Sequence, residues 1–348
     1  MGSFKVVSPA RVDLAGGTLD IWPLYCLVGG AKTVNLAIDL CVTVTVDVAP
    51  NSGFEISIQG VGGETVTLPA GKMPDPGSVP EALRLPAFVV GAYISHRVEL
   101  PDLRVKLGVS SDIPAQSGLG GSSALCVALA RAMARLFGDF IQQGWQWKMV
   151  EWARDVEAAY LGHMTGTQDY LASLFGGAAC YTYEYGMVDR VAYPDATIAG
   201  FAERMMVLYS GETHDSSLSN WEILKGAFQR EAPVMRGLQA IRQISEDLDA
   251  ELQSGNLSWK HIGQLLNREW DVRKTLFRVN TPRLDQIVQM LSGLQVLGAK
   301  VCGAAQGGSL VVLVDPDRRA AIARECERLG VRVLRAQVSR PGTSVTES

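Results

Sequence analysis

The sequence predicts an α+β fold with two domains, and three observations lead to this prediction. Segments in which apolar and polar residues alternate and β-branched residues are frequent lie near the N-terminus and again near the C-terminus, as is typical of strands. Between them, apolar residues recur at helical spacing over long segments. The chain has 348 residues, enough for two domains of roughly 100–200 residues each. We expect the first domain at residues 1–195 and the second at residues 196–348.

The first half of the chain is expected to begin with strands and to continue with helices. The strand patterns lie at residues 4–14, 41–48, 55–58 and 65–68. The prolines and glycines between residues 71 and 80 predict a surface loop, because both residue types favour turns. Apolar residues at helical spacing then predict helices at residues 86–96, 123–137 and 147–160.

The second half of the chain is expected to begin with a strand, to continue with helices and to end with two further strands. A strand is predicted at residues 204–208, and long helices follow to about residue 295. Two further strands, at residues 309–314 and 331–336, predict a second, smaller sheet. No internal repeat or low-complexity block interrupts this order.

Composition is typical of a globular protein and argues against several classes. The apolar fraction is 47%, the charged fraction 20% and the net charge −4, so no basic surface for nucleic acid or an anionic membrane is indicated. The six cysteines contain no Cys-x-x-Cys pair and the four histidines show no metal spacing, so no zinc site is predicted. No signal peptide or membrane span is indicated, and we expect a cytoplasmic monomer or homodimer.

Residues 111–124 form a loop rich in glycine and serine that runs into a predicted helix. Three glycines there, Gly118, Gly120 and Gly121, allow close approach of the backbone to a ligand. Ser122 or Ser123 is expected to cap the helix, whose first N–H groups could bind a phosphate. An ordinary turn is the alternative. The loop lacks the lysine of a Walker motif and the spacing of a dinucleotide-binding loop.

This loop resembles the second motif of the galactokinase, homoserine kinase, mevalonate kinase and phosphomevalonate kinase (GHMP) superfamily, with Gly121 where serine is usual. Residues 8–20, followed by 28–30 and 34–38, resemble the first motif in its sugar-kinase form, and residues 300–309 resemble the third, departing at Ala305 and Gln306. The resemblance implies an N-terminal domain like domain 2 of ribosomal protein S5 and a ferredoxin-like C-terminal domain. It also implies that ATP binds at Ser117, Gly118, Leu119, Gly120, Gly121, Ser122 and Ser123.

The resemblance places the catalytic aspartate at Asp169 and a metal-binding glutamate at Glu157. Taken alone, Asp169 could cap a helix and Glu157 could be a surface acid. Tyr170 follows the aspartate where the family usually has glutamine, which affects an expected substrate contact. The family's first motif supplies Arg11, whose alternative reading is a surface ion pair.

These residue types suit phosphoryl transfer from ATP. Ser122 and Glu157 carry the oxygen ligands that Mg²⁺ prefers. Asp169 can orient or deprotonate the attacking hydroxyl, and Arg11 supplies a permanent positive charge beside it. The predicted cofactors are therefore ATP and Mg²⁺.

The first motif also indicates the acceptor. Gly16, Gly17, Thr18 and Asp20 are expected to bind a sugar, because a carboxylate can accept hydrogen bonds from neighbouring hydroxyls. Helix capping by Asp20 is the alternative. Residues 266–274 and 280–285 are similar to kinases that act at the anomeric carbon of fucose or of heptose 7-phosphate, although Trp270 within them is typical of core packing.

The sequence therefore predicts a sugar kinase that phosphorylates a hydroxyl, the anomeric one, of a hexose or heptose or its 7-phosphate. Its partner is expected to be a small sugar or sugar phosphate, without nucleic acid or membrane. Two alternatives stay open: a kinase of a non-sugar alcohol such as mevalonate or homoserine, and a non-catalytic sensor of sugar or nucleotide.

Overall fold

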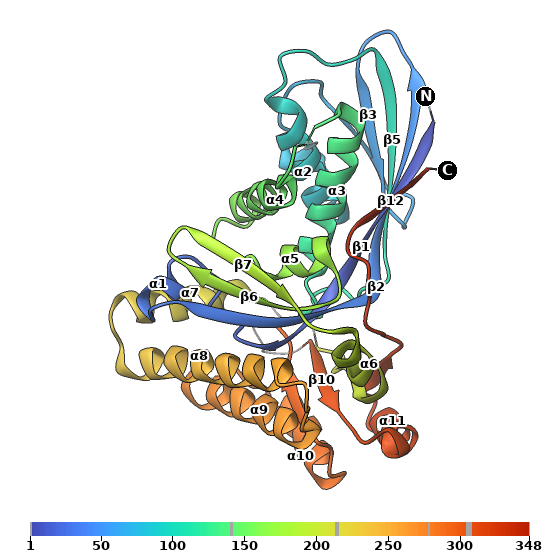
Figure 1. The fold of residues 1–348 in the computed structure, drawn as a ribbon. Coiled ribbons are helices and arrows are strands. Elements are labelled where there is room, and N and C mark those ends of the chain that lie inside the picture. Colours follow the sequence, from blue (N-terminus) through green and yellow to red (C-terminus); the bar gives the residue numbers. More distant parts are fainter. Residues whose placement is uncertain (1, 140–141, 213–215, 278, 304–307, 348) are drawn as a thin grey trace.

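The computed structural model describes residues 2–139, 142–212, 216–277, 279–303 and 308–347. Within these ranges the chain forms one sheet of eight strands and one of four, with helices packed around both (Figure 1). This arrangement confirms the predicted α+β class.

The larger sheet is organised around one long strand. Its path is β12-β1-β2-β5-β3-β4, and β6 and β7 extend from β2. The 20-residue β2 pairs with β6 through its first part and with β5 through its last part, so the strand predicted at residues 41–48 is only one end of it. The strands are β1 (Ser3–Ala15), β2 (Ala31–Pro50), β3 (Glu55–Gln59), β4 (Thr65–Leu68), β5 (Leu103–Ser111), β6 (Ala178–Glu184), β7 (Met187–Ala192) and β12 (Ser344–Glu347).

Helices α2 to α5 cover one face of this sheet (Figure 1). Their bounds are α2 (Arg84–Ser95), α3 (Gly121–Phe137), α4 (Trp145–Leu161) and α5 (Gln168–Phe175), and the short α1 (Leu24–Leu27) precedes β2. Helix α3 contacts β1, β2 and the other three helices of this layer. Five of its ten buried residues are alanines, whose small side chains let the surrounding elements approach closely.

The smaller sheet has the order β11-β8-β10-β9 and is antiparallel throughout. Its strands are β8 (Met205–Tyr209), β9 (Gly298–Val301), β10 (Ser309–Leu313) and β11 (Arg332–Leu334). The helices of this part of the chain are α6 (Asp195–Arg204), α7 (Ser216–Phe228), α8 (Ala232–Gln253), α9 (Trp259–Val272), α10 (Pro282–Gly293) and α11 (Arg319–Arg328). Helix α8 contacts β1 and β2 of the larger sheet, and α7 packs against α8. The strand predicted from residue 204 begins one residue later, because Arg204 ends α6.

The predicted start and cap of the loop-to-helix junction are wrong. Helix α3 begins at Gly121, and Gly120, with a φ of 75°, is its N-cap without any side-chain capping bond. The hydroxyl of Ser123 donates instead to Glu157 at 3.0 Å. Ser122 and Ser123 are the second and third residues of the helix, so neither can be its N-cap.

The C-terminal strand returns to the first sheet. Strand β12 pairs antiparallel with β1, and the two ends of the chain lie close together (Figure 1). The division at residue 195 stays a prediction; beyond it, β12 pairs with β1 and Val338 forms a β-bridge with Ile38 of β2. No helix among the described residues has the length and apolar character needed to cross a membrane.

Candidate active site

The three sequence motifs meet at the loop before α3. The backbone N–H of Arg11, on β1, donates to the carbonyl of Leu119 at 3.0 Å. The N–H of Ser309, on β10, donates to the carbonyl of Ser117 at 2.8 Å. Gly303 has a φ of 68°, and a Cβ there would lie 3.0 Å from the Gly118 carbonyl oxygen. Strands from both sheets therefore hold the loop, while residues 304–307, with the departures at Ala305 and Gln306, lie outside the described residues.

Arg11 and Asp169 form a two-pronged ion pair across this loop. The Nε and Nη2 atoms of Arg11 donate to the two carboxylate oxygens of Asp169, each at 2.7 Å, and Nη1 donates to the Gly118 carbonyl at 2.6 Å. Burial by itself lowers the pKa of Arg11, but the negative charges of Asp169 and Asp13 outweigh it and raise this pKa. Only 4% of the arginine is exposed, so the alternative of a surface ion pair is wrong.

Asp169 is the second residue of α5 and lies against the backbone of the glycine- and serine-rich loop at residues 111–124. A Cβ on Gly120 would lie 3.1 Å from its Oδ2 atom, so the glycine leaves space for the carboxylate. The N-cap of α5 is Thr167, so Asp169 is not a capping residue. Its side chain is 23% exposed and lines the main cavity, as a group that meets a substrate must.

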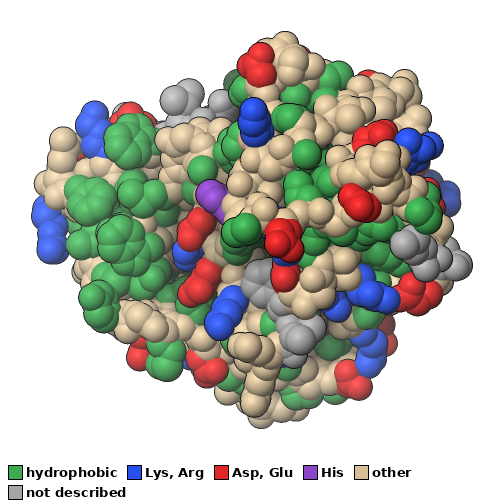
Figure 2. Space-filling view, turned by 90° about the horizontal axis from the view of Figure 1, so that it is seen from above, with side chains coloured by type: hydrophobic (Ala, Val, Ile, Leu, Met, Phe, Trp, Pro, Cys, Tyr) green, Lys and Arg blue, Asp and Glu red, His purple; other side chains and the backbone are tan. Residues whose placement is uncertain are grey.

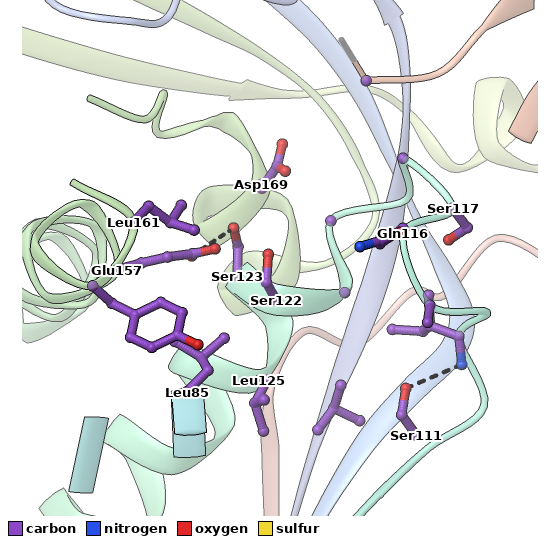
Figure 3. A pocket seen from close by; sticks show the side chains of 18 of the residues that line it. Leu85, Ser111, Gln116, Ser117, Ser122, Ser123, Leu125, Glu157, Leu161 and Asp169 are labelled. Atoms are coloured by element: carbon purple, nitrogen blue, oxygen red, sulfur yellow. Dashed lines mark hydrogen bonds between the residues drawn. The ribbon is translucent and has the colours of Figure 1, made fainter. Parts of the chain in front are cut away.

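Glu157, on α4, points from that helix toward α3 (Figure 3). Only 3% of it is exposed, so the alternative of a surface acid is wrong. Its Oε2 atom accepts hydrogen bonds from Ser123 at 3.0 Å and from the hydroxyl of Tyr170 at 2.5 Å. Burial raises the pKa of Glu157, and hydrogen bonds from Ser122, Tyr170 and Ser123 oppose this rise. Tyr170 is fully buried and orients this carboxylate.

The donor set at this point fits Mg²⁺. The hydroxyl of Ser122 and the carboxylate of Glu157 both line the main cavity, and both offer the oxygen ligands of a hard cation. The described residues contain no group of three or more His, Cys, Asp or Glu side chains placed to hold a metal. That is compatible with Mg²⁺, which usually takes only one or two protein carboxylates and completes its shell with phosphates and water.

The main cavity has a volume of about 820 Å³ and joins the phosphate loop to Asp20. Two polar atoms at its wall are buried and have no hydrogen-bond partner among the described residues, the Oγ of Ser117 and the Oε1 of Gln168. Buried polar atoms normally have partners, so these two indicate a polar ligand. The face seen in Figure 2 intersperses basic and acidic side chains without a continuous basic area.

Asp20 reaches the same cavity from the turn after β1. Its Oδ2 atom accepts the backbone N–H of Gln168, the first residue of α5, at 3.0 Å. A Cβ on Gly166 would collide with this carboxylate, which explains the glycine there. Burial raises the pKa of Asp20 to about 6. Helix α1 has Pro23 as its N-cap, so Asp20 does not cap the helix that follows the glycine turn.

Glu269 and Arg273, from the second half of the chain, form hydrogen bonds with the turn at Gly16–Thr18. The Nη2 of Arg273 donates to the Gly17 carbonyl at 2.6 Å, and Nη1 donates to the Thr18 hydroxyl at 3.3 Å. Glu269 accepts the N–H of Gly16 at 3.0 Å. Thr18 has a φ of 80°, a strained value for a β-branched residue that needs such support.

These two side chains belong to a larger buried network of charges. Lys300, on β9, donates to the carboxylate of Asp13 and lies 3.6 Å from Glu269, which pairs with Arg273 at 3.0 Å. Asp13 also accepts the N–H of Gly303 at 2.8 Å. At most 1% of each of the four charged side chains is exposed. The network ties the turn at Gly16–Thr18 to the third motif, and no sequence motif predicts it.

Sequence spacing gave no signal for this network, since Lys300 lies 287 positions from Asp13. The prediction that Trp270 packs in the core is confirmed: it is 2% exposed and lies in the apolar cluster of the smaller sheet. The neighbouring residues Glu269 and Arg273 face the charged network instead.

Known proteins resemble the whole chain. Residues 87–177 match the family described as GHMP kinases N terminal domain, and residues 250–332 match GHMP kinases C terminal. An L-fucokinase/L-fucose-1-P guanylyltransferase of Bacteroides fragilis is 28% identical over 90% of this chain, which spans only 35% of that longer protein. A D-glycero-α-D-manno-heptose 7-phosphate kinase of Campylobacter jejuni is 25% identical over 92% of this chain and 91% of its own length. The crystal structure of a D-glycero-D-manno-heptose 1-phosphate kinase from Bacteroides thetaiotaomicron superposes with a TM-score of 0.76, at 18% identity over 99% of both chains.

Proposed function

Because this chain belongs to the GHMP kinase family, it is an ATP-dependent kinase, and we propose that it phosphorylates the anomeric hydroxyl of a hexose or heptose. The acceptor is a free sugar or a sugar phosphate such as heptose 7-phosphate. The curated relatives named for fucose and heptose 7-phosphate support a sugar as the acceptor.

One observation carries this proposal. Asp169 and Asp20 line the same cavity as the glycine- and serine-rich loop at residues 111–124. The short segment that contains Gly166 and Gln168 lies between these two carboxylates. A substrate whose hydroxyls bind Asp20 can present another hydroxyl to Asp169. A polyhydroxylated molecule satisfies both carboxylates at once, whereas an alcohol with a single hydroxyl does not.

Each part of the chain then has a task in the transfer. The N–H groups around Gly120 and at the start of α3 bind the phosphates of ATP. Ser122 and Glu157 would hold Mg²⁺, which when bound neutralises charge on the phosphates. Asp169 orients the acceptor hydroxyl and accepts its proton, while Arg11 fixes the carboxylate and keeps positive charge beside the transferred group.

A substrate panel tests the proposal. ATP consumption would be measured with free hexoses, D-glycero-D-manno-heptose and its 7-phosphate, mevalonate and homoserine. We expect turnover with at least one sugar and none with the two non-sugar alcohols. Turnover confined to mevalonate or homoserine would favour the non-sugar alternative, and binding of sugar and ATP without turnover would favour the sensor.

Replacing Glu157 by Gln is expected to raise the Mg²⁺ concentration needed for half-maximal rate by about tenfold or more. The amide keeps the size of the side chain but removes the charge that a hard cation prefers. Tyr170→Phe removes only the phenol that donates to Glu157, so it should shift the Mg²⁺ titration in the same direction by less. A titration that Glu157→Gln leaves unchanged would remove Glu157 from the metal site.

Replacing Asp20 by Asn is expected to raise the KM for sugar about 10- to 100-fold, because hydrogen bonds to a charged group are each stronger by about 1 kcal/mol. The side-chain oxygen of Asn can still accept the Gln168 N–H. Since burial raises the pKa of Asp20 to about 6, its carboxylate forms as the pH rises through that value. The wild-type KM for sugar should therefore fall between pH 5 and 7.

The variant should show no such pH dependence, and its KM for ATP should match that of the wild type. If Asp20→Asn raised the KM for ATP and left that for sugar unchanged, Asp20 would serve the nucleotide side of the cavity.

A further inference from the structure

A second, smaller cavity lies on the far side of Asp20. Its volume is about 310 Å³, and Asp20 and Thr165 line both it and the main cavity. Helix α4, strands β6 and β7, the segment at residues 163–167 and the start of α1 surround it. A ligand gripped by Asp20 can therefore extend into this space, away from the phosphate loop.

The walls of this smaller cavity suit a sugar. Trp22 and Tyr25 offer aromatic surfaces, and the fully buried Tyr183 supports Tyr25, with ring centroids 5.8 Å apart. Thr165 and Thr167 add hydroxyls beside the Asp20 carboxylate. Apolar surface with a few hydrogen-bonding groups is typical of a small-molecule site, and it matches the C–H and O–H groups of a carbohydrate.

The charges of the cavity favour an uncharged ligand. Its charged lining residues are two carboxylates, Asp20 and Asp155, and one guanidinium, Arg154. Arg154 already donates to the Oδ1 of Asp155, from Nε at 2.8 Å, with Nη2 at 2.7 Å from the same oxygen. A terminal phosphate brings a charge of about −1.5 to −2 and would meet the carboxylates of Asp20 and Asp155, while the one cation of the lining, Arg154, already pairs with Asp155.

We propose that this cavity binds the terminal, uncharged carbons of the acceptor sugar, so that the enzyme prefers a free sugar to its terminal phosphate ester. This inference rests on the proposed sugar-kinase function and narrows its substrate class. It selects between the two acceptors that the proposed function allows, the free sugar and the sugar 7-phosphate.

The test compares matched substrates that differ only in the phosphate. The kcat/KM values would be measured for D-mannose and mannose 6-phosphate, and for D-glycero-D-manno-heptose and its 7-phosphate. We expect at least one free sugar to be turned over, with a kcat/KM at least about tenfold above that of its ester, given the cost of like charges in a confined site. Asp155→Asn should raise the relative kcat/KM of the ester about threefold or more, because it removes one repulsive charge and frees Arg154.

Two control variants separate this site from general effects. Glu151→Gln removes an exposed carboxylate from the same helix and should leave the ratio of the two kcat/KM values unchanged. Trp22→Ala should raise the KM for sugar, whereas Trp221→Ala should not. Trp22 is 56% exposed and lines the cavity, while Trp221 is 52% exposed and lines neither cavity.

A higher kcat/KM for the phosphate esters, lost in Arg154→Gln, would overturn this inference and leave the sugar-kinase function standing. A preference for free sugars that Asp155→Asn does not change would overturn the argument from charge. Absence of turnover with every sugar and every ester would refute the proposed function itself.

Discussion

Replacing Asp169 by Asn is expected to lower kcat about 10³-fold or more, because a positioned general base typically contributes 10²- to 10⁴-fold. The amide keeps the shape of the side chain but cannot accept the proton of the attacking hydroxyl. It also deprives Arg11, which is 4% exposed, of its ion-pair partner and leaves Asp13 as the nearby negative charge. The measurement is steady-state turnover at saturating ATP and sugar.

Nucleotide binding supplies the control for this variant. Because the phosphate loop is held by backbone bonds from Arg11 and Ser309, ATP affinity should change little in Asp169→Asn. Near-normal turnover would remove Asp169 from the chemistry. A loss of turnover with an equal loss of ATP binding would instead make it a structural support of the loop.

Replacing Lys300 by Met is expected to lower the free energy of unfolding by about 3–5 kcal/mol, the usual cost of breaking a buried ion pair from one side. The variant would leave the buried carboxylates of Asp13 and Glu269 without the positive charge of Lys300. None of these three side chains is exposed. Urea unfolding measures the change.

Lys274→Met is the matched control, since Lys274 pairs with Asp285 at 2.5 Å but both side chains are 39% exposed. It should cost no more than about 1 kcal/mol. Equal losses in the two variants would show that the buried network does not stabilise the fold more than a surface pair.

Acid provides a second readout for the Lys300 variant. Burial opposes ionisation of Asp13, but the charges of Lys300, Arg11 and Arg273 lower its pKa below the usual 3.8. The ionised Asp13 therefore stabilises the folded wild type at neutral pH, and this stabilisation is lost as the pH falls from 3.8 through the lowered pKa of Asp13. Without Lys300 the carboxyl binds a proton more readily in the folded state, so the stability difference between wild type and variant should narrow in acid.

Many of the residues that line the main cavity could be singled out from the sequence because their local patterns are distinctive. Residues 111–124 combine glycines and serines ahead of a helix, and the motif that contains Asp169 carries its own glycines. The contact between Arg11 and Asp169, 158 positions apart, could be expected only from the family resemblance.

Other features depend on packing that spacing does not reveal. Arg273 and Glu269 follow the i, i+4 pattern of an exposed helix pair. Both are nevertheless buried, because the end of α9 packs against the turn at Gly16–Thr18. Strand β12 is only four residues long, and it exists because β1 has an edge for it to pair with. Ser123 has the residue type of a helix cap, but α3 begins two residues before it, at Gly121, and its hydroxyl donates to the buried Glu157.

The most direct test of the central claim is the position of the phosphate in the product. The enzyme would be incubated with ATP and the best sugar of the panel, and the product would be examined by ¹H–³¹P correlation NMR. We predict a phosphorus coupled to the anomeric proton, with no such product from Asp169→Asn. A phosphorus coupled to a proton on another carbon, or ATP consumed without any sugar phosphate, would contradict it.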